Sequence, residues 1–580
     1  MKKFLALCLS LVCLTSLAGP KVILKLDDVY VKDGNISCKP AIDVLSGRGI
    51  KASLGIIALT TDETLGKGLA PYLAMKAADG GPLFEFWNHG LDHKRPEFFE
   101  TGYDYQLDHL KRSDEIVTAR SGIRMKTFGA PYNAVDENTA KALVATGNFT
   151  HVFFAPAKYF EGTGIVVLNN RVNLENGTGN VEFAYLKKNF EASKYTDFIV
   201  LQGHPNGWKD QKIKEFSQVL DYLLSQGCTF ILPQEITGAD PELIRANSLL
   251  YAPDVTIVNK KAVPPSGDKH DYVSMGPYWW PDPSKPDGKP YIRKDGQINP
   301  ERENYTDRAN FGKMSSSVQA LARTYAKTGD EKYAQRAVKF LDTFFLNPET
   351  KMNPHIEYGQ FIPGITNGRA EGIIETASVP ALIKAMSTLQ KSKSGTADLD
   401  KGMKQWMSDY YKWLTTSKIG LDEQHAKNNH GTYYDSQCLA ILPWLGRTKE
   451  AKQYYKKITL PRLVAQIPPD GSQPKELART KAFSYSVMNL NGFVRIAGLA
   501  EEIGLDLWQY KKHGQVYLKS MIDWFIPYLT KEKEFTWPQI ERTSVRELVP
   551  TLNQAAEKYN DPSYRQVIEK LQPLSDTIVL

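Results

Sequence analysis

The chain has 580 residues, with 72 Lys and Arg against 65 Asp and Glu, which gives a formal net charge of +7. This length exceeds what one ordinary hydrophobic core supports, so we expect at least two domains. Hydrophobic residues make up 42% and charged residues 24%, a balance typical of globular proteins. No basic run suggests a nucleic-acid partner, and no segment after the N-terminal stretch has the pattern of a membrane span.

The first 18 residues have the pattern of a secretory signal. Lys2 and Lys3 form a positive start, residues 4–14 are apolar, and residues 16–18 (Ser-Leu-Ala) form a small-x-small cleavage site. A membrane anchor is the alternative, but the apolar run is shorter than the roughly 20 residues that span a bilayer. We therefore expect an exported protein, periplasmic or extracellular, without a membrane anchor. Cleavage removes Lys2 and Lys3 and lowers the formal charge from +7 to +5. The remaining positive charge suits a polyanionic partner, with ordinary surface charge as the alternative.

Two of the five cysteines, Cys8 and Cys13, lie in this leader. The other three, Cys38, Cys228 and Cys438, are odd in number and widely spaced, which fits neither a disulfide framework nor a zinc signature. We expect buried thiols, with one Cys38–Cys228 bridge as the alternative.

Residues 19–240 alternate short apolar runs with helical spacing, a β/α pattern that predicts a largely parallel sheet or barrel. The predicted strands are 21–26, 83–87, 151–154, 198–201 and 229–232, and helical spacing occupies 136–146 and 214–225. A Gly-Ala-Asp-Pro run at 238–241 marks the expected domain boundary.

Polar residues follow three of these strands. They are Asp27 and Asp28 after the first, His89 and His93 after the second, and His204 after the fourth. Because the carboxyl ends of parallel strands gather at one edge, we expect these side chains to meet there. An Asp with a His-x-x-x-His pair is a three-ligand set for Zn²⁺ or a similar ion.

This pattern resembles the polysaccharide deacetylase family across residues 21–236. The resemblance implies a deformed β/α barrel in which Asp27 is the general base and His204 the general acid. Asp28, His89 and His93 would be the ligands of a divalent metal such as Zn²⁺.

Two features depart from that family's pattern. Its third motif has an Arg shortly before a Pro, where Gly129 stands in this chain. Its Asp-Trp motif, which tunes the catalytic His, is not found. An active deacetylase and a degenerate barrel kept for packing or carbohydrate binding both remain open.

Residues 241–580 read as mainly helical. Helical spacing occupies 315–345, broken at 328–330, and 370–389, 399–415, 435–446, 449–458 and 485–503. Stacked helical hairpins of this kind can build an α/α toroid. A Pro-, Gly- and Asp-rich stretch at 262–290 is expected to be a long ordered loop.

Four residues of this half form a catalytic set: Asn429, His430, Arg479 and Tyr485. Asn and Arg suit the neutralisation of a carboxylate, and His and Tyr suit proton transfer beside it. Cleavage of a uronic-acid polysaccharide by β-elimination needs these two abilities together. Any one of the four alone is more often part of a turn or a core. We expect a helix to begin near Tyr433, which leaves Asn429 and His430 in a loop.

The region 252–525 resembles the alginate lyase family. The matching motifs are 277–283 (Pro-Tyr-Trp-Trp-Pro-Asp-Pro), 367–376 (Asn-Gly-Arg-Ala-Glu-Gly-Ile-Ile-Glu-Thr), 428–431 (Asn-Asn-His-Gly) and 470–479 (Asp-Gly-Ser-Gln-Pro-Lys-Glu-Leu-Ala-Arg). The resemblance implies that Asn429 and Arg479 neutralise the carboxylate, without a catalytic metal. It implies that Tyr485 is base and acid, or acid alone with His430 as base.

Three further residues are candidates for substrate binding. Trp279 and Trp280 can form a stacking platform for a sugar ring, with structural packing as the alternative. Arg369 can bind a substrate carboxylate, or pair with Glu371 or Glu375.

The sequence thus predicts an exported enzyme that cleaves an anionic, alginate- or glucuronan-like polysaccharide and removes its acetyl groups. One alternative is a metal-dependent deacetylase whose toroid only binds glycan. Another is a glycan-binding protein with two inactive domains. The uronic acid, the metal and the oligomeric state are left open.

Overall fold

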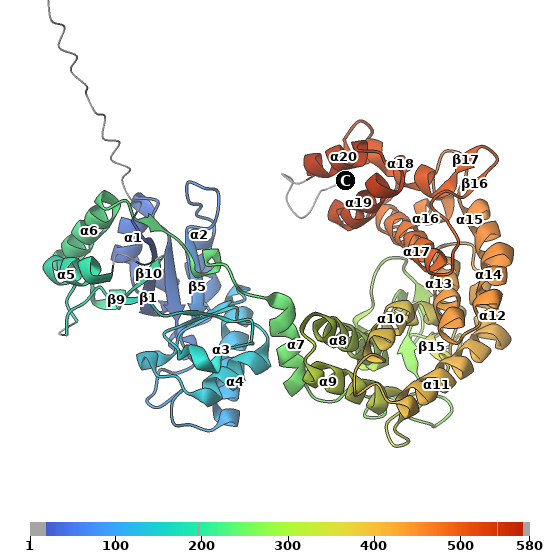
Figure 1. The fold of residues 1–580 in the computed structure, drawn as a ribbon, viewed down its shortest axis with the longest axis horizontal. Coiled ribbons are helices and arrows are strands. Elements are labelled where there is room, and N and C mark those ends of the chain that lie inside the picture. Colours follow the sequence, from blue (N-terminus) through green and yellow to red (C-terminus); the bar gives the residue numbers. More distant parts are fainter. Residues whose placement is uncertain (1–18, 178, 194–195, 197, 542, 572–580) are drawn as a thin grey trace, which may run out of the picture. The chain divides into compact units, whose positions relative to one another are not determined.

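The structure is a computed structural model and describes residues 19–177, 179–193, 196, 198–541 and 543–571. The predicted signal, residues 1–18, lies outside the described residues. The chain divides into two compact units, Met1–Ala252 and Pro253–Leu580 (Figure 1). In the described part of the chain, no helix is both long and apolar enough to cross a membrane.

The first unit is built on a nine-stranded sheet whose neighbouring strands run parallel, in the order β8-β7-β6-β5-β4-β1-β10-β9, with β11 beside β1. The strands are β1 (Lys21–Val29), β4 (Ala52–Ile56), β5 (Phe84–Asn88), β6 (Thr127–Phe128), β7 (His151–Phe153), β8 (Val166–Leu168), β9 (Arg171–Asn173), β10 (Phe198–Gly203) and β11 (Thr229–Phe230). A hairpin of β2 (Val31–Lys32) and β3 (Asn35–Ile36) follows β1. The α/β prediction is confirmed.

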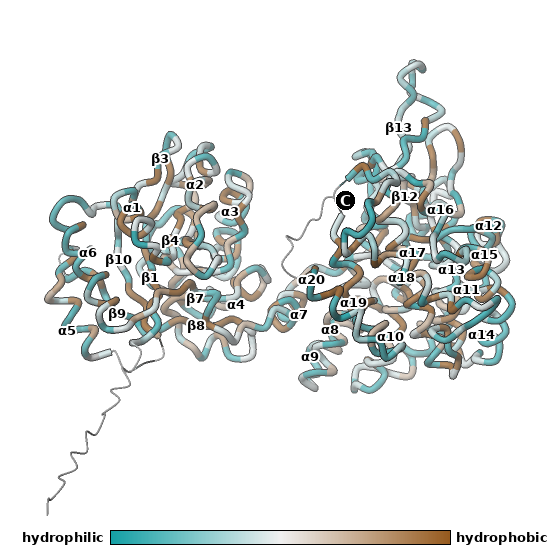
Figure 2. The backbone as a smooth tube through the Cα atoms, turned by 90° about the horizontal axis from the view of Figure 1, so that it is seen from above, coloured by the Kyte–Doolittle hydropathy of each residue, from teal (hydrophilic) through white to brown (hydrophobic). Residues whose placement is uncertain are grey.

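The helices α1 (Lys39–Gly47), α2 (Leu65–Leu73), α3 (Tyr103–Ser121), α4 (Glu137–Thr146), α5 (Phe183–Ser193) and α6 (Asp210–Ser225) lie between these strands in the chain, and α7 (Pro241–Tyr251) follows the last of them. The strand β4 and most of β1 and β10 are buried, so their sequences read as continuous apolar runs. Figure 2 shows apolar colour along the strands of this unit. β1 extends to Val29, so Asp27 and Asp28 lie within it, where its pairing with β4 shifts register.

The second unit consists mainly of helices that pack against one another and curve into an open ring (Figure 1). They are α8 (Asp307–Thr328), α9 (Glu331–Leu341), α10 (Val379–Leu389), α11 (Ala397–Thr416), α12 (Lys418–Gln424), α13 (Asn429–Trp444), α14 (Thr448–Tyr454), α15 (Leu460–Gln466), α16 (Pro474–Leu477), α17 (Ala482–Glu502), α18 (Tyr517–Leu529), α19 (Val549–Lys558) and α20 (Ser563–Leu571). This arrangement agrees with the predicted toroid.

Short strands supplement the helices: β12 (Val273–Met275) with β15 (Tyr358–Phe361), β13 (Trp279–Trp280) with β14 (Ile292–Arg293), and β16 (Lys511–Lys512) with β17 (Gln515–Val516). The stretch expected to be one long loop therefore contains β12 and β13. The helix expected over 370–389 is a 3₁₀ segment, Ala370–Thr376, followed by α10.

The three cysteines of the described chain, Cys38, Cys228 and Cys438, are free and buried. The alternative of a Cys38–Cys228 bridge is therefore not realised, and the expectation of buried thiols is confirmed.

Candidate active sites

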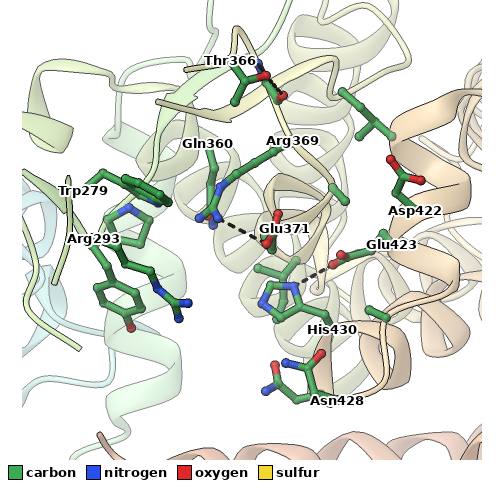
Figure 3. A pocket seen from close by; sticks show the side chains of 18 of the residues that line it. Trp279, Arg293, Gln360, Thr366, Arg369, Glu371, Asp422, Glu423, Asn428 and His430 are labelled. Carbon is green, nitrogen blue, oxygen red and sulfur yellow. Dashed lines mark hydrogen bonds and ion pairs between the residues drawn. The ribbon is translucent and has the colours of Figure 1, made fainter. Parts of the chain in front are cut away.

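The second unit contains a cavity of about 1370 Å³, which exceeds the space that one small molecule needs and suits several sugar units. Asn429, His430, Arg479 and Tyr485 all line it, although they come from three separate segments. Figure 3 shows His430 beside Glu423 in this cavity, with Trp279 and Arg293 across from them.

Asn429 is the first residue of α13, not a loop residue as the sequence predicted. The Glu476 carboxylate accepts hydrogen bonds from the backbone N–H of Asn429 at 2.6 Å and from its Nδ2 at 2.7 Å. This buried carboxylate therefore completes the positive end of the helix, which is why α13 starts here. The Asn429 Oδ1 atom is buried and has no hydrogen-bond partner, so the amide has capacity left for a ligand in the cavity.

Close packing explains why a glycine, Gly431, follows His430. A Cβ atom on Gly431 would lie 1.9 Å from Nη1 of Arg462 and 2.3 Å from the carbonyl oxygen of Ala426. The Arg462 Nη1 donates to that same carbonyl at 2.5 Å, which fixes the turn before α13. The close approach of this guanidinium thus requires glycine at position 431.

His430 forms a buried pair with Glu423. Its Nδ1 lies 2.7 Å from Oε1 of Glu423, whose side chain is 1% exposed. Burial opposes a charged imidazole, but the adjacent carboxylate prevails and raises the pKa of His430. Because Nδ1 is engaged, Nε2 is the ring nitrogen available for proton transfer.

Arg479 and Tyr485 lie face to face. The guanidinium carbon is 4.0 Å from the centroid of the phenol ring, and Asp295 binds Nε and Nη2 of Arg479 at 3.1 and 2.8 Å. The hydroxyl of Tyr485 is 2.6 Å from that of Tyr278. Burial and the Tyr278 hydroxyl raise the pKa of Tyr485 above its ordinary value despite Arg479, so the phenol is protonated and suited to act as an acid.

Trp279 lines the cavity but Trp280 does not. The indole of Trp280 instead donates to the carbonyl of Gln297 at 3.0 Å and lies under Lys294. Trp279 is thus the one of the two tryptophans that lines this cavity.

Arg369 also lines this cavity and pairs with Glu371, as one of the two readings of the sequence had it. Its Nη2 donates to Oε1 of Gln360, and its Nε is buried without a partner. Glu375, the other partner considered, instead accepts from Tyr272 and Ser274.

The first unit brings Asp28, His89 and His93 together. Oδ1 of Asp28 lies 3.2 Å from Nε2 of His89 and 3.1 Å from Nε2 of His93. The three ligand atoms all lie within 4.8 Å of one another, and Oδ1 of Asp28 is buried without a hydrogen-bond partner. One carboxylate and two imidazoles aimed at a common point fit a divalent cation such as Zn²⁺. The backbone carbonyl of Gly129 lies 2.7 Å from Nδ1 of His89, which orients the ring for this role.

Asp27 is held by two buried side chains. Lys25 Nζ contacts its two carboxylate oxygens at 2.6 and 2.5 Å, and Gln202 Nε2 donates to Oδ2 at 2.6 Å. A Cβ atom at Gly129 would lie 2.7 Å from the Trp87 ring and 3.3 Å from Cε of Lys25. Lys25 thus supplies a positive charge beside Asp27 while Gly129 leaves room for it.

His204 lies 3.9 Å from Asp27 through its Nε2. Its Nδ1 is 2.7 Å from Oε2 of Glu175, and Trp208 Nε1 donates to the other oxygen of Glu175 at 2.7 Å. The hydrogen bond to Glu175 outweighs burial and raises the pKa of His204. Glu175 therefore binds His204 and is itself held by Trp208, in a chain where no Asp-Trp motif was found.

Among the charged partners that the sequence did not reveal are Glu423, Glu476, Asp295, Lys25 and Glu175. Only Lys25 had a visible signal, as a lone charge inside the apolar strand β1, where a buried Lys requires a partner. Asp295 and Glu175 lie 184 and 29 residues from the groups they bind, so no local spacing reveals them.

Comparisons with known proteins follow the same division. The family model "Alginate lyase" matches residues 256–535, and "Polysaccharide deacetylase" matches residues 16–150. The crystal structure of an alginate lyase from Bacteroides ovatus is similar at 39% identity and a TM-score of 0.55, covering 58% of this chain and 89% of that one.

Two further solved structures are similar to part of the chain. The Xyl-CE4 domain of a multidomain xylanase from the hindgut metagenome of Trinervitermes trinervoides has 15% identity and a TM-score of 0.27, covering 38% of this chain and 94% of that one. A family 4 carbohydrate esterase from Streptomyces lividans has 14% identity and a TM-score of 0.27, covering 38% and 95%. No curated protein matches the chain significantly.

The match to the second unit is decisive, because it joins 39% identity to near-complete coverage of the solved relative. The chain therefore belongs to the alginate lyase family and is a polysaccharide lyase with a deacetylase-like N-terminal unit.

Proposed function

We propose that the C-terminal unit cleaves a uronic-acid polysaccharide, alginate or a similar uronan, by β-elimination. The observation that carries this is the convergence of Asn429, His430, Arg479 and Tyr485 on one cavity. Removal of the C5 proton places a second negative charge on a uronic-acid residue that already bears a carboxylate. Donors aimed at that carboxylate therefore stabilise the transition state. The similarity to an alginate lyase supports alginate as the first substrate to test.

The geometry favours a division of labour between His430 and Tyr485. His430 has Nδ1 committed to Glu423, which makes Nε2 a stronger acceptor, so we assign it the base. Tyr485 has a raised pKa and keeps its proton, so we assign it the acid that protonates the leaving glycosidic oxygen. Asn429 and Arg479 face the carboxylate, and Trp279 and Arg369 bind flanking sugars. No metal is invoked for this unit.

The N-terminal unit, residues 19–240 in this proposal, is a carbohydrate deacetylase. Asp28, His89 and His93 would hold a divalent cation, which supplies Lewis acidity toward water and the ester carbonyl when bound. Asp27 takes the proton from water, and His204 donates one to the leaving hydroxyl.

Joining the two activities has a physical rationale. An acetyl group adds bulk and removes a hydrogen-bond donor from a sugar hydroxyl, so deacetylation prepares the polymer for the lyase cavity. The signal predicted for residues 1–18 and the proposed polyanionic substrate agree with action outside the cytoplasm, in the periplasm or the medium.

Near-ultraviolet absorbance during incubation with alginate blocks, glucuronan and their acetylated forms tests the proposal. Elimination creates a conjugated double bond, whereas hydrolysis does not. A rise on one polymer that is lost in Tyr485→Phe supports the lyase and names its substrate. No rise on any polymer, with metal-dependent acetate release lost in Asp28→Ala, would reduce the toroid to glycan binding. If there is neither an absorbance rise nor acetate release, both units would be binding domains.

A further inference from the structure

The second unit has another cavity, of about 750 Å³, outside the site described above. The segment that separates the two cavities is the motif around α16. Pro474, Leu477 and Ala478 line the second cavity, and the next residue, Arg479, lines the first. The second cavity is therefore one short segment away from the catalytic residues, yet it shares none of its lining residues with the first.

Half-buried aromatic rings form one wall. Trp524 and Tyr528 come from α18, and Trp537 comes from the segment after it. The ring centroids of Trp524 and Tyr528 are 4.8 Å apart, and those of Trp524 and Trp537 are 5.6 Å apart. Phe535 packs against Tyr528 and Trp537 at 5.6 and 5.2 Å. These contacts already fix the rings, so the protein loses little side-chain entropy when a ligand stacks on them.

Polar groups complete the lining. Neither indole N–H of Trp524 and Trp537 has a hydrogen-bond partner within the described residues, and both side chains are partly exposed. Asp470, Ser472 and Ser520 also line the cavity and offer hydroxyl and carboxylate groups. A ring-shaped ligand with one apolar face and several hydroxyls, which is a sugar, matches this mixture.

The charges argue against a uronate at this position. Asp523 is paired with Lys519 at 2.9 Å, and the exposed Asp470 and Lys533 offset each other. The catalytic cavity is lined by three arginines, Lys418 and His430 beside four carboxylates, whereas no arginine or histidine is among the lining residues of the second cavity. Without surplus positive charge, the second cavity gains nothing from a carboxylate and favours an uncharged sugar.

We propose that this second cavity is a non-catalytic binding site for neutral hexose units of a polysaccharide. The inference extends the proposed function, in that it adds a neutral glycan to the uronan that the lyase cavity takes. It does not require the lyase to be active, because binding alone defines it.

Isothermal titration calorimetry tests the proposal with three probes: β-1,4-linked mannohexaose, cellohexaose and a mannuronate hexamer. At least one neutral hexamer should bind wild type and Tyr485→Phe equally. Its affinity should fall about tenfold in Trp537→Ala, as expected from the loss of one aromatic stacking contact, and much less in Trp537→Phe, which keeps a ring. Melting temperatures of both variants report whether the fold is retained.

A second measurement does not depend on the variants. Saturating neutral hexamer should leave the initial rate of cleavage of short uronate oligomers unchanged, because the two cavities are separate. The proposal is overturned if neither neutral hexamer binds, if Trp537→Ala binds as well as wild type, or if the neutral hexamer inhibits cleavage competitively. Binding of the mannuronate hexamer alone through Trp537 would overturn it as well. Failure of the lyase proposal would show instead as absent cleavage with neutral binding intact.

Discussion

Replacing Glu423 by Gln isolates the charge that acts on His430. The variant keeps an oxygen that can accept from Nδ1, so the orientation of the ring is retained while the negative charge is lost. The contact is 2.7 Å long and its acceptor is 1% exposed, conditions under which a charge-assisted hydrogen bond contributes about 1.5–3 kcal/mol. At 1.36 kcal/mol per unit, this corresponds to a drop of about 1–2 units in the pKa of His430.

The assay is the initial rate of absorbance increase on the preferred uronan, measured as kcat/KM against pH. If His430 is the base, activity rises as its imidazolium loses the proton, and Glu423→Gln shifts this acid limb to lower pH by about 1–2 units. The plateau falls too, because a less basic imidazole is a poorer base. Asp422→Asn is the matched control, since that neighbouring carboxylate lines the same cavity but pairs with Lys418. An unmoved acid limb would refute the assignment of His430 and leave Tyr485 as base and acid.

Four other predictions concern acid catalysis, stability, pH dependence and metal. Tyr485→Phe should lower kcat of the lyase by about 10²–10⁴-fold, whereas Tyr278→Phe, which removes only its hydroxyl neighbour, should cost far less in the same assay. Lys25→Met should destabilise the N-terminal unit by about 3–5 kcal/mol in urea unfolding, because it leaves the Asp27 carboxylate buried without its cation. Adding Asp27→Asn should recover most of this loss. Equal losses in the single and the double variant would argue against the pairing. Burial raises the pKa of Glu85 from 4.5 to about 7, so Glu85 should by itself lower the stability of this unit by about 3 kcal/mol between pH 4.5 and 7. Calorimetry should find the loss of stability over this range smaller by that amount in Glu85→Gln. A chelator should stop acetate release and leave absorbance-monitored cleavage intact, and loss of both would contradict a metal-free lyase.

The fold was predictable where a local signal decides the backbone. The break at 328–330 is one case: α8 ends at Thr328, Gly329 takes a left-handed φ of +71°, and α9 begins at Glu331. The start of α13 was not, because the group that completes its N-terminus is Glu476, which lies 47 residues downstream of Asn429. Asn-Asn-His-Gly taken alone has the composition of a turn.

The candidate sites divide in a similar way. Residues expected to touch substrate or metal lie in recognisable motifs, because their chemistry restricts the residue type at each position. Their partners are restricted only by distance in space. Glu423 for His430 and Asp295 for Arg479 could have been other carboxylates on other elements, so the sequence alone could not assign them.

The two departures from the deacetylase pattern show the consequence for function. In the sequence, Gly129 stands where the family has an Arg and the Asp-Trp motif is not found, which leaves a degenerate barrel open as the alternative to an active deacetylase. In the structure, Lys25 places a buried ammonium beside Asp27, and Glu175 binds His204 while it accepts a hydrogen bond from Trp208. A barrel kept only for packing would have no need for a fully buried ion pair, since apolar residues of similar volume are often as stable or more so. The buried Lys25–Asp27 pair therefore agrees with the proposed deacetylase, in which Asp27 takes part in catalysis.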